Sequence, residues 1–241
     1  MEKLTNKVAL ITGGTKGIGR GIAESLLQLG MNVAITSRTV SAAENAANEL
    51  NKSNSGKGEA IGIKADVRDY DSQKEAVEQT LEKWGSLDVL VANAGLGHFG
   101  NIEDLSVSQW EETISTNLTG VFYSVKAALA ALKKSEGYIF TISSLAGTNF
   151  FAGGSAYNAS KFGLTGFTQA LMLDVRDQGI KVTTIMPGSV ATHFAGHEPS
   201  TEDDWKIQSE DLGQLVSDLL QMHPRTLPSK VEVRPSKPPK K

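Results

Sequence analysis

Six short runs of β-branched and aliphatic residues alternate with longer helical patterns, and this alternation constrains the fold more than any other feature of the sequence. The runs lie at 7–11, 32–36, 60–64, 87–92, 138–143 and 181–186. Strands that are apolar along most of their length are typical of parallel sheets covered on both faces. The segments between them predict helices near 18–29, 41–52, 72–84, 108–133, 157–177 and 209–221.

This pattern predicts an α/β fold of the Rossmann type, in which one doubly wound, mainly parallel sheet carries helices on both faces. The 241 residues, 39% of them hydrophobic, suffice for one such domain, which we assign to residues 1–233. The segment 234–241 is basic and rich in proline, so we expect an extended, flexible tail. Ligands of such sheets bind beyond the carboxyl ends of the strands, and the candidate residues should collect there.

The composition excludes several classes of function. A net charge of −3 gives no overall basic field of the kind that binds nucleic acid by its phosphates. The absence of cysteine excludes disulfides, thiolate catalysis and cysteine-ligated metal. No apolar run is long enough to span a membrane, and the first run continues into a glycine-rich loop, unlike a signal peptide. We therefore expect a cytoplasmic protein without a nucleic-acid or membrane partner.

A glycine-rich loop, TGGTKGIGRG at 12–21, follows the first expected strand and precedes an amphipathic helix. Gly13, Gly17 and Gly19 allow a tight turn and a close approach of the backbone to a diphosphate, which the N–H groups of the helix N-terminus would bind. The spacing GxxxGxG differs from the GxGxxG fingerprint, so the loop alone is also consistent with an ordinary strand-to-helix turn. It makes a dinucleotide the leading candidate ligand.

The residues that end the second strand indicate which dinucleotide is preferred. Sites that select NAD usually carry a carboxylate here to bind the ribose 2′-hydroxyl, whereas an arginine accommodates a 2′-phosphate. This sequence has Ser37 and Arg38, and Lys16 in the glycine loop can add a second positive charge. Because the carboxylate is missing and both cations are present, the sequence favours NADP(H).

Several motifs in a fixed order carry a resemblance to a known family. They are TGGTKGIG at 12–19, ADV at 65–67, NAG at 93–95, Asn117, ISS at 142–144, YNASK at 157–161 and PGSVAT at 187–192. A YxxxK motif alone is common by chance, but the ordered set resembles the short-chain dehydrogenase/reductase family from the first strand to about Thr192. The resemblance implies an oxidoreductase with a nicotinamide cofactor.

The resemblance also implies roles for individual residues. It assigns catalysis to Asn117, a serine, Tyr157 and Lys161. Family members commonly place the serine thirteen residues before the tyrosine, which selects Ser144, with Ser143 as the alternative. Together with the loop argument, the expected cofactor contacts are Gly13, Thr15, Lys16, Gly17, Ile18, Gly19, Ser37, Arg38, Asp66, Val67, Asn93, Ala94, Gly95, Tyr157, Lys161, Pro187, Gly188, Val190 and Thr192.

The chemistry of carbonyl reduction explains why these residue types are wanted. Hydride addition puts negative charge on the oxygen, so the site needs a hydrogen-bond donor and a proton source there. Tyr157 would be the acid and Ser144 the donor, while Asn117 would hold a water that continues the proton path. A free phenol titrates near ~10, and a nearby cation favours its ionised form. Lys161 follows Tyr157 by one helical turn and would lower its pKa, together with the charge of an oxidised nicotinamide.

Apolar residues beside the motifs suggest a largely apolar substrate pocket, with ordinary core packing as the alternative. They are Leu96, Phe99, Phe150, Phe151 and Phe194. The stretch 195–209 would form a short substrate lid, and its acidic residues 202–204 would be solvated surface.

His193 and His197 lie four residues apart and raise the question of a metal site. A glycine and a proline interrupt their segment, and no third ligand is evident, so we expect no metal.

The sequence thus predicts an NADP(H)-dependent oxidoreductase that transfers hydride between nicotinamide and a small carbonyl or secondary alcohol. Reduction of 3-oxoacyl groups on carrier protein is the named alternative, although the chain lacks the glycine-rich C-terminal segment with which many such members form a tetramer. A non-catalytic NADP(H)-binding regulator is a second alternative, against which the intact catalytic set argues. The resemblance suggests a homodimer through the helices at 108–133 and 157–177, or a homotetramer.

Overall fold

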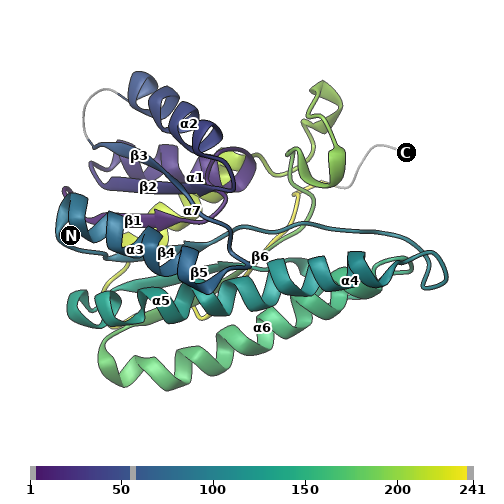
Figure 1. Cartoon of the computed structure of the whole chain (residues 1–241). Coiled ribbons are helices and arrows are strands. Elements are labelled where there is room, and N and C mark those ends of the chain that lie inside the picture. The colour runs from purple at the N-terminus through teal and green to yellow at the C-terminus, as the bar shows by residue number, and fades with distance from the viewer. Residues whose placement is uncertain (1–3, 55–57, 238–241) are drawn as a thin grey trace.

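The computed structural model describes residues 4–54 and 58–237 and contains a seven-stranded sheet in the order β3-β2-β1-β4-β5-β6-β7. Every pairing in this sheet is parallel. The strands are β1 Val8–Ile11, β2 Asn32–Ser37, β3 Ala60–Lys64, β4 Val89–Ala92, β5 Tyr138–Ile142, β6 Lys181–Pro187 and β7 Lys230–Val233. The predicted doubly wound α/β fold is confirmed (Figure 1). The end of the expected tail, 238–241, lies outside the described residues.

Helices cover both faces of the sheet. They are α1 Gly17–Gln28, α2 Val40–Ser53, α3 Tyr70–Trp84, α4 Val107–Ile114, α5 Gly120–Ser135, α6 Ser155–Val175 and α7 Ser209–Gln221. One cluster of buried apolar side chains joins α1, α2 and α7 to the sheet, and a second joins α3, α5 and α6 to it. Successive strand residues point to opposite faces, so Leu10 and Ile11 of β1 belong to different clusters. Within 4–54 and 58–237, no helix is long and apolar enough to cross a bilayer.

The helix expected at 108–133 is present and contains a π-helical turn. α4 ends at Ile114, the π-turn spans Ser115–Thr119, and α5 begins at Gly120, with helical backbone angles at both junctions. Such π-turns inside helices often occur at functional sites. The turn is relevant to function because it carries Asn117.

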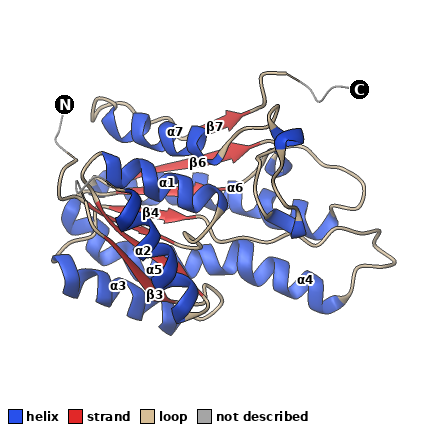
Figure 2. Cartoon of the chain, turned by 90° about the horizontal axis from the view of Figure 1, so that it is seen from above, coloured by secondary structure: helices blue, strands red, loops and turns tan. Residues whose placement is uncertain are grey.

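The strand order determines where a ligand can bind. The chain builds the sheet outward from β1 in one direction and from β4 in the other, so the loops after these two central strands diverge. Figure 2 shows the strand arrows pointing toward the edge where the later loops gather. The segments after β4, β5 and β6 therefore lie at the same edge as the glycine loop after β1.

α1 and α7 cross at two glycines. A Cβ on Gly21 would collide with the backbone of Ser209, and a Cβ on Gly213 would collide with Ser25 Oγ and the Gly21 carbonyl oxygen. Glycine at both positions thus lets the two helix backbones approach closely. Because α1 begins in the glycine loop, this crossing also holds the N-terminus of α1 in place.

We expect Gly213→Val to destabilise the fold through this crossing. Forcing extra volume into a packed contact typically costs about 1–3 kcal/mol, which for a domain of this size lowers Tm by about 3–10 °C. Gly166→Ala is the matched control, because a Cβ at this exposed position in α6 meets nothing within 4 Å. Alanine there should leave Tm unchanged or raise it slightly. Thermal unfolding followed by circular dichroism checks both variants, and equal losses would contradict the packing argument.

Candidate functional site

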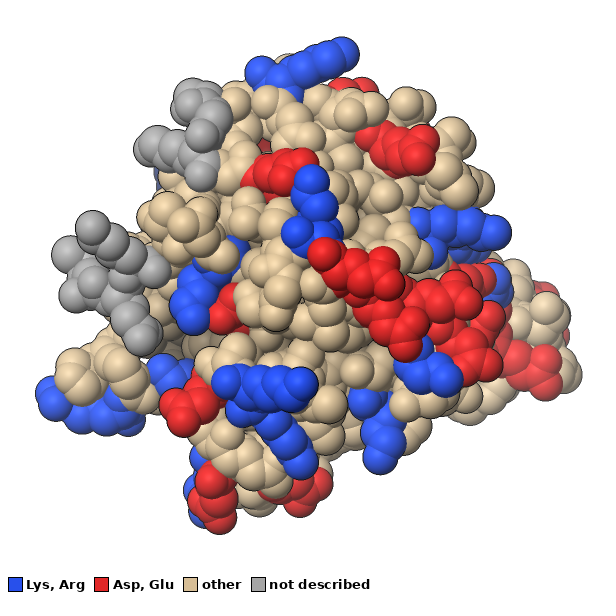
Figure 3. All heavy atoms as spheres, turned by 60° about the vertical axis from the view of Figure 1, so that its left-hand side comes forward, with Lys and Arg blue, Asp and Glu red and all other residues tan. Residues whose placement is uncertain are grey.

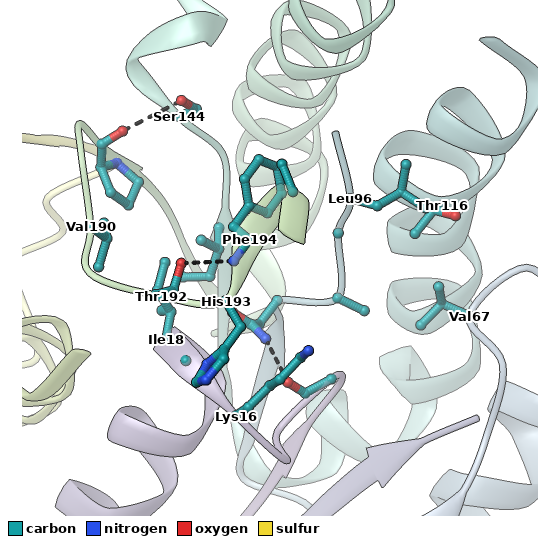
Figure 4. A pocket seen from close by; sticks show the side chains of 18 of the residues that line it. Lys16, Ile18, Val67, Leu96, Thr116, Ser144, Val190, Thr192, His193 and Phe194 are labelled. Atoms are coloured by element: carbon teal, nitrogen blue, oxygen red, sulfur yellow. Dashed lines mark hydrogen bonds between the residues drawn. The ribbon is translucent and has the colours of Figure 1, made fainter. Parts of the chain in front are cut away.

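A cavity of about 680 Å³ opens at the carboxyl edge of the sheet. Figure 4 shows Ser144, Val190 and Phe194 on one side of it, facing Leu96 and Thr116 on the other. Most of the residues suggested by the sequence line this one cavity: Gly13, Thr15, Lys16, Gly17, Ile18, Ser37, Arg38, Asp66, Val67, Asn93, Ala94, Gly95, Ser144, Tyr157, Lys161, Pro187, Gly188, Val190 and Thr192. Among the suggested catalytic and cofactor residues, Gly19 and Asn117 are not on its wall. Of the suggested pocket residues, Leu96 and Phe194 line it, whereas Phe99, Phe150 and Phe151 do not.

The glycine loop has the conformation that an approaching diphosphate requires. Gly13 and Gly17 adopt φ values of 65° and 56°, a region that favours glycine. Gly19 acts from behind the loop, because a Cβ there would lie 2.7 Å from the Gly13 carbonyl oxygen. The N-terminus of α1, which follows, has no side-chain cap, so its first N–H groups face the loop without a side-chain acceptor.

Hydrogen bonds tie the glycine loop to the loop after β4. The hydroxyl oxygen of Thr12 accepts bonds from the backbone N–H groups of Asn93 at 3.0 Å and Ala94 at 3.1 Å. In return, Asn93 Nδ2 donates to the carbonyl oxygens of Thr12 at 2.9 Å and Gly13 at 3.0 Å. The two sides of the cavity are thereby held as one unit.

The cavity wall is strongly basic, although the protein as a whole is slightly acidic. Its charged lysine, arginine and carboxylate side chains are Lys16, Arg38, Arg68, Lys161, Lys206 and Asp66. On the outer face in Figure 3, by contrast, charges of both signs are interspersed. The guanidinium of Arg68 lies 2.6 Å from Asp66 Oδ2 and lowers the pKa of that carboxyl group, and the charge of Arg38 adds to this effect.

The two candidate serines differ in orientation. The hydroxyl of Ser143 donates to the Lys161 carbonyl oxygen at 3.2 Å and lies 3.0 Å from Thr165 Oγ1, so it is engaged with α6. The hydroxyl of Ser144 interacts with that of Tyr157. Its other contacts are a bond from the Ala146 N–H at 3.1 Å and a long one to the Pro187 carbonyl oxygen at 3.4 Å. This geometry favours Ser144 as the donor to a substrate oxygen.

Tyr157 and Lys161 face the cavity from the first turns of α6. The Lys161 ammonium lies 5.7 Å from the centroid of the Tyr157 ring and donates a hydrogen bond to the Ile142 carbonyl oxygen at 2.9 Å. Burial lowers the pKa of Lys161 to about 8. Burial also raises the pKa of Tyr157, which the hydrogen bond with Ser144 only partly offsets.

The sequence predicted a lowered pKa for Tyr157. Among the groups that the chain itself supplies, the net effect is instead to raise this pKa. The sequence shows the spacing of the two side chains but not how deeply the fold buries the phenol, and burial penalises the phenolate.

Asn117 is fully buried behind the cavity and fixes its wall. Its side-chain oxygen accepts the Leu96 N–H at 2.9 Å, and its Nδ2 donates to the Leu96 carbonyl oxygen at 2.8 Å and to Ser160 Oγ at 3.1 Å. Both amide hydrogens are therefore used, and the side chain holds the loop after β4 against α6. The Cβ of a residue at Gly95 would lie 3.3 Å from Asn117 Oδ1, so glycine leaves space above it.

The expected lid contains a buried ion cluster. Asp203 is only 4% exposed, with Oδ2 2.6 Å from His197 Nε2 and Oδ1 2.5 Å from Lys206 Nζ. These two partners hold the pKa of Asp203 far below its usual range. The expectation that residues 202–204 are solvated surface was wrong for Asp203, because the lid folds back on this carboxylate. His197 and Lys206 consequently line the cavity.

Each of the two lid histidines has a carboxylate neighbour. His193 Nε2 lies 3.4 Å from Glu198 Oε2, and His197 is paired with Asp203. In the part of the chain that the structure describes, no group of three His, Cys, Asp or Glu side chains is arranged to hold a metal ion.

Four rings form what we call the aromatic cluster: Phe99, Phe151, Tyr157 and Phe194. Phe99 and Phe194 pack on the Tyr157 ring with centroids 5.3 and 5.6 Å away. Phe150 lies outside the cluster and is 85% exposed, which differs from its expected place in an apolar pocket. The alternative of ordinary core packing does not hold for these phenylalanines, since all four are exposed by at least a third.

Comparison with known proteins identifies the family. A family model described as short chain dehydrogenase matches residues 7–203. The chain belongs to the short-chain dehydrogenase/reductase family. One relative of this oxidoreductase, the trans-4-hydroxycyclohexanecarboxylate dehydrogenase of Sinomonas cyclohexanicum, is 39% identical over 194 residues, covering 79% of this chain and 75% of that protein.

Solved structures of short-chain dehydrogenases share the whole fold. The alcohol dehydrogenase of the archaeon Thermococcus sibiricus, complexed with 5-hydroxy-NADP, aligns with a TM-score of 0.89 at 29% identity, covering 98% of this chain and 99% of that one. The 3-ketoacyl-(acyl-carrier-protein) reductase of Brucella melitensis, complexed with NADH, aligns with a TM-score of 0.86 at 25% identity, covering 97% and 98%. Because both types of dinucleotide occur among these neighbours, the preference of this dehydrogenase rests on its own cavity.

Several residues of this short-chain dehydrogenase were missed by the sequence argument. Arg68, His197 and Lys206 line the cavity, and Thr12 ties its two sides together. Thr12 is the first residue of the TGGTKGIG motif and Arg68 directly follows the ADV motif, so both had a local signal. The lid residues had none, because their position depends on the fold of the loop around Asp203.

The buried ammonium of Lys161 should make the stability of this dehydrogenase depend on pH. Its pKa is about 8 in the folded protein and ~10.4 in an unfolded chain, so between these values the unfolded state binds more protons. The free energy of unfolding should therefore rise with pH, by about 2 kcal/mol from pH ~7.5 to ~9.5.

Lys161→Met should lack this rise, while Lys52→Met, which alters an exposed side chain of α2, should keep it. Urea unfolding of the three proteins at the two pH values measures the difference. A rise of the same size in Lys161→Met would show that another group causes it.

Proposed function

We propose that this chain is an NADP(H)-dependent oxidoreductase that transfers a hydride between the nicotinamide and a small carbonyl or secondary alcohol substrate. The observation that carries the proposal is the convergence of the glycine loop, a basic wall and the side chains of Ser144, Tyr157 and Lys161 on one cavity. A phosphate-rich cofactor and a proton donor are both needed for hydride transfer to a carbonyl, and here they would meet.

The pairing of the cavity cations supports NADP(H) over NAD(H). Arg68 and Lys206 already have carboxylate partners, in Asp66 and Asp203. Among the described residues no carboxylate forms an ion pair with Lys16 or Arg38, which line the cavity. A 2′-phosphate beside these two side chains would supply the direct anionic partner that neither has in an ion pair.

The remaining cofactor contacts follow from the order of the loops around the cavity. The diphosphate would lie at the N-terminus of α1, against Gly13, Thr15, Gly17 and Ile18, with Gly19 supporting the loop. The adenine end would contact Asp66 and Val67, and the ribose and nicotinamide would contact Asn93, Ala94, Gly95, Pro187, Gly188, Val190 and Thr192. Lys161 would also reach the nicotinamide ribose.

Three side chains would carry the proton chemistry. A reduced nicotinamide, when bound, would supply the hydride for the carbonyl carbon. Tyr157 then donates its proton to the carbonyl oxygen, and Ser144 donates a hydrogen bond to the same atom. Because burial raises its pKa, the Tyr157 hydroxyl is protonated at neutral pH and ready to act as an acid. The nearby Lys161 ammonium stabilises the phenolate that results, and alcohol oxidation uses the same groups in reverse.

Asn117 has a positioning role in this proposal. Its amide bonds hold the backbone of Leu96, a residue that lines the cavity, so the loop after β4 keeps its place beside Tyr157 and Lys161. The water relay expected of Asn117 stays a prediction. Its two amide hydrogens are bonded, but its side-chain oxygen accepts one hydrogen bond and has a second lone pair to which a water can donate.

The same cavity accommodates the two alternatives. A 3-oxoacyl thioester is a carbonyl substrate of the kind named for the Brucella melitensis neighbour, and it requires the same Tyr157 chemistry. A non-catalytic regulator would bind NADP(H) without using Tyr157. The exposed phenylalanines beside Tyr157 favour a largely apolar substrate over both.

We also propose that the chain forms a homodimer through α5 and α6. Phe122 of α5 is 45% exposed, and Phe162 and Leu173 of α6 are 43% and 55% exposed. The rings of Phe122 and Phe167 pack 6.2 Å apart and join the two helices into one apolar outer face. Light scattering should give the mass of two chains. A monomer would contradict the proposal, and four chains would indicate the tetramer alternative.

Arg38→Ala should weaken the binding of NADPH far more than that of NADH. Loss of a charge-assisted phosphate contact costs about 1.5–3 kcal/mol, so we expect the Kd of NADPH to rise by about 10-fold to 100-fold. The Kd of NADH should change less than about twofold, because NADH has no 2′-phosphate. Titration of nicotinamide fluorescence measures both. Arg176→Ala, at an exposed arginine after α6, serves as the control, and equal losses for the two cofactors would overturn the NADP(H) assignment.

Tyr157→Phe should abolish turnover while leaving cofactor affinity nearly intact. Removal of a general acid typically lowers kcat by about 100-fold or more. NADPH consumption is followed with a panel of ketones, 3-oxoacyl thioesters and quinones, and Tyr123→Phe on α5 is the control. Substantial residual activity in Tyr157→Phe would place the proton donor elsewhere. Tight NADPH binding without turnover of any compound by the unmodified chain would support the regulator alternative.

A further inference from the structure

We infer that the substrate carries an aromatic ring next to its reacting carbonyl, and that Phe99 is the residue that selects this ring. The inference rests on the proposed function, because it names the substrate class of the same site. It is drawn from the aromatic cluster, in which Phe99 and Phe194 pack on the ring of Tyr157 and Phe151 packs on Phe99.

The cluster is assembled at the carboxyl edge from three separate loops. Phe99 follows β4, Phe151 follows β5 and Phe194 follows β6. Phe99 is the central ring, with centroids 5.3 Å from Tyr157, 6.0 Å from Phe151 and 6.2 Å from Phe194. Phe194 also packs on Tyr157, and both line the cavity, while Phe99 contacts both of these rings from outside the wall. A substrate whose carbonyl reaches the Tyr157 hydroxyl would therefore lie beside the cluster.

The backbone around the cluster is shaped to receive the rings. A Cβ at Gly97 would lie 2.8 Å from the Cζ atoms of both Phe99 and Phe194, and a Cβ at Gly154 would lie 2.6 Å from Phe151 Cε2. Glycine at these two positions therefore lets three rings rest directly on the loops. Phenylalanines that merely extend into solvent would not require glycine in the backbone beneath them.

The loop that carries Phe151 is held in place from the catalytic helix. Asn158, next to Tyr157, donates its two amide hydrogens to the carbonyl oxygens of Ala146 and Asn149, each at 2.8 Å. The Gly100 N–H donates to the Gly153 carbonyl oxygen at 2.9 Å and joins this loop to the one that carries Phe99. The rings are thus positioned before a ligand arrives, which reduces the entropy lost on binding.

The rings keep apolar surface exposed that a packed core would bury. Phe99, Phe151 and Phe194 are 48%, 49% and 36% exposed. Clustered exposed apolar surface beside a cavity marks a binding site, whereas single exposed side chains are ordinary. Phe150 is the ordinary case, because it is 85% exposed and makes no ring contact among the described residues.

The geometry of the rings favours an aromatic group over a saturated one. The pairs around Phe99 are tilted or edge-on, with interplanar angles of 42°, 63° and 66°. A flat aromatic substrate ring can extend this pattern, because it can present its edge to the face of one phenylalanine and its face to the edge of another. A puckered or flexible group cannot do this. In the reaction, the aryl ketone accepts a hydride from NADPH at its carbonyl carbon and the Tyr157 proton at its oxygen. The products are a benzylic alcohol and NADP⁺.

The test compares acetophenone with cyclohexyl methyl ketone, which has the same carbon skeleton without an aromatic ring. Phe99→Leu keeps apolar volume but removes the aromatic ring at the centre of the cluster. We expect Phe99→Leu to lower kcat/KM for acetophenone about 10-fold and for cyclohexyl methyl ketone less than about threefold. Each ketone is compared with itself in the unmodified enzyme, so differences in intrinsic reactivity cancel. Phe150→Leu is the matched control and should leave both values unchanged.

Equal losses for the two ketones in Phe99→Leu, or no loss for either, would overturn the inference while leaving the oxidoreductase proposal intact. A second readout does not depend on turnover. Saturation-transfer NMR with acetophenone and NADP⁺ should show transfer to the aromatic protons in the unmodified chain and in Phe150→Leu, and much less in Phe99→Leu. Ring binding without consumption of NADPH by any ketone would support the aromatic site and contradict the proposed function. Absence of transfer in the unmodified chain would overturn the aromatic site.

Discussion

The pairing of β1 with β4 at the centre of the sheet is the constraint on which the site depends. The Thr12 N–H continues this ladder to the Val91 carbonyl oxygen at 3.0 Å, and the Thr12 hydroxyl then receives the backbone of Asn93 and Ala94. The loop that would bind the diphosphate and the loop beside the catalytic side chains are therefore fixed to each other before any ligand binds. Parallel strands make this possible because their carboxyl ends meet at one edge.

The sequence was sufficient for the fold class because six of the seven strands of this doubly wound sheet are mainly apolar runs, and the motif residues follow those runs directly. The edge strand β7, Lys230–Val233, alternates charged and apolar residues and is not such a run. The sequence was insufficient wherever the outcome depends on three-dimensional burial. The π-turn at Ser115–Thr119 lies within a segment that is helical throughout, and the helical pattern of the sequence did not show which turn has π hydrogen bonds. The sequence predicted that Asp203 is one of three solvated carboxylates, whereas in the folded lid it lies between His197 and Lys206. The pKa direction of Tyr157 likewise followed from burial, which spacing does not reveal.

Burial has opposite effects on the two titrating groups of the site, and the combination suits proton transfer. It raises the pKa of the Tyr157 phenol and lowers that of the Lys161 ammonium to about 8, so each group is driven toward its neutral form. The pKa values of both groups are thereby set by their buried surroundings. When the phenol loses its proton, the phenolate and the ammonium compensate each other's charge in those surroundings, where the attraction is stronger than in water. While the phenol of Tyr157 is still protonated, the ammonium of Lys161 is already in place. It can then stabilise the phenolate that forms when Tyr157 gives up its proton.

The cavity has a cationic part and an aromatic part, and the stretch from Phe194 to the end of the lid contributes to both. Lys206 and His197, fixed by Asp203, lie on the cavity wall, while Phe194, directly before the lid, packs on Tyr157 and Phe99. The buried carboxylate of Asp203 therefore fixes the fold of a lid that supplies cations to one part of the cavity and begins beside the ring that closes the other part.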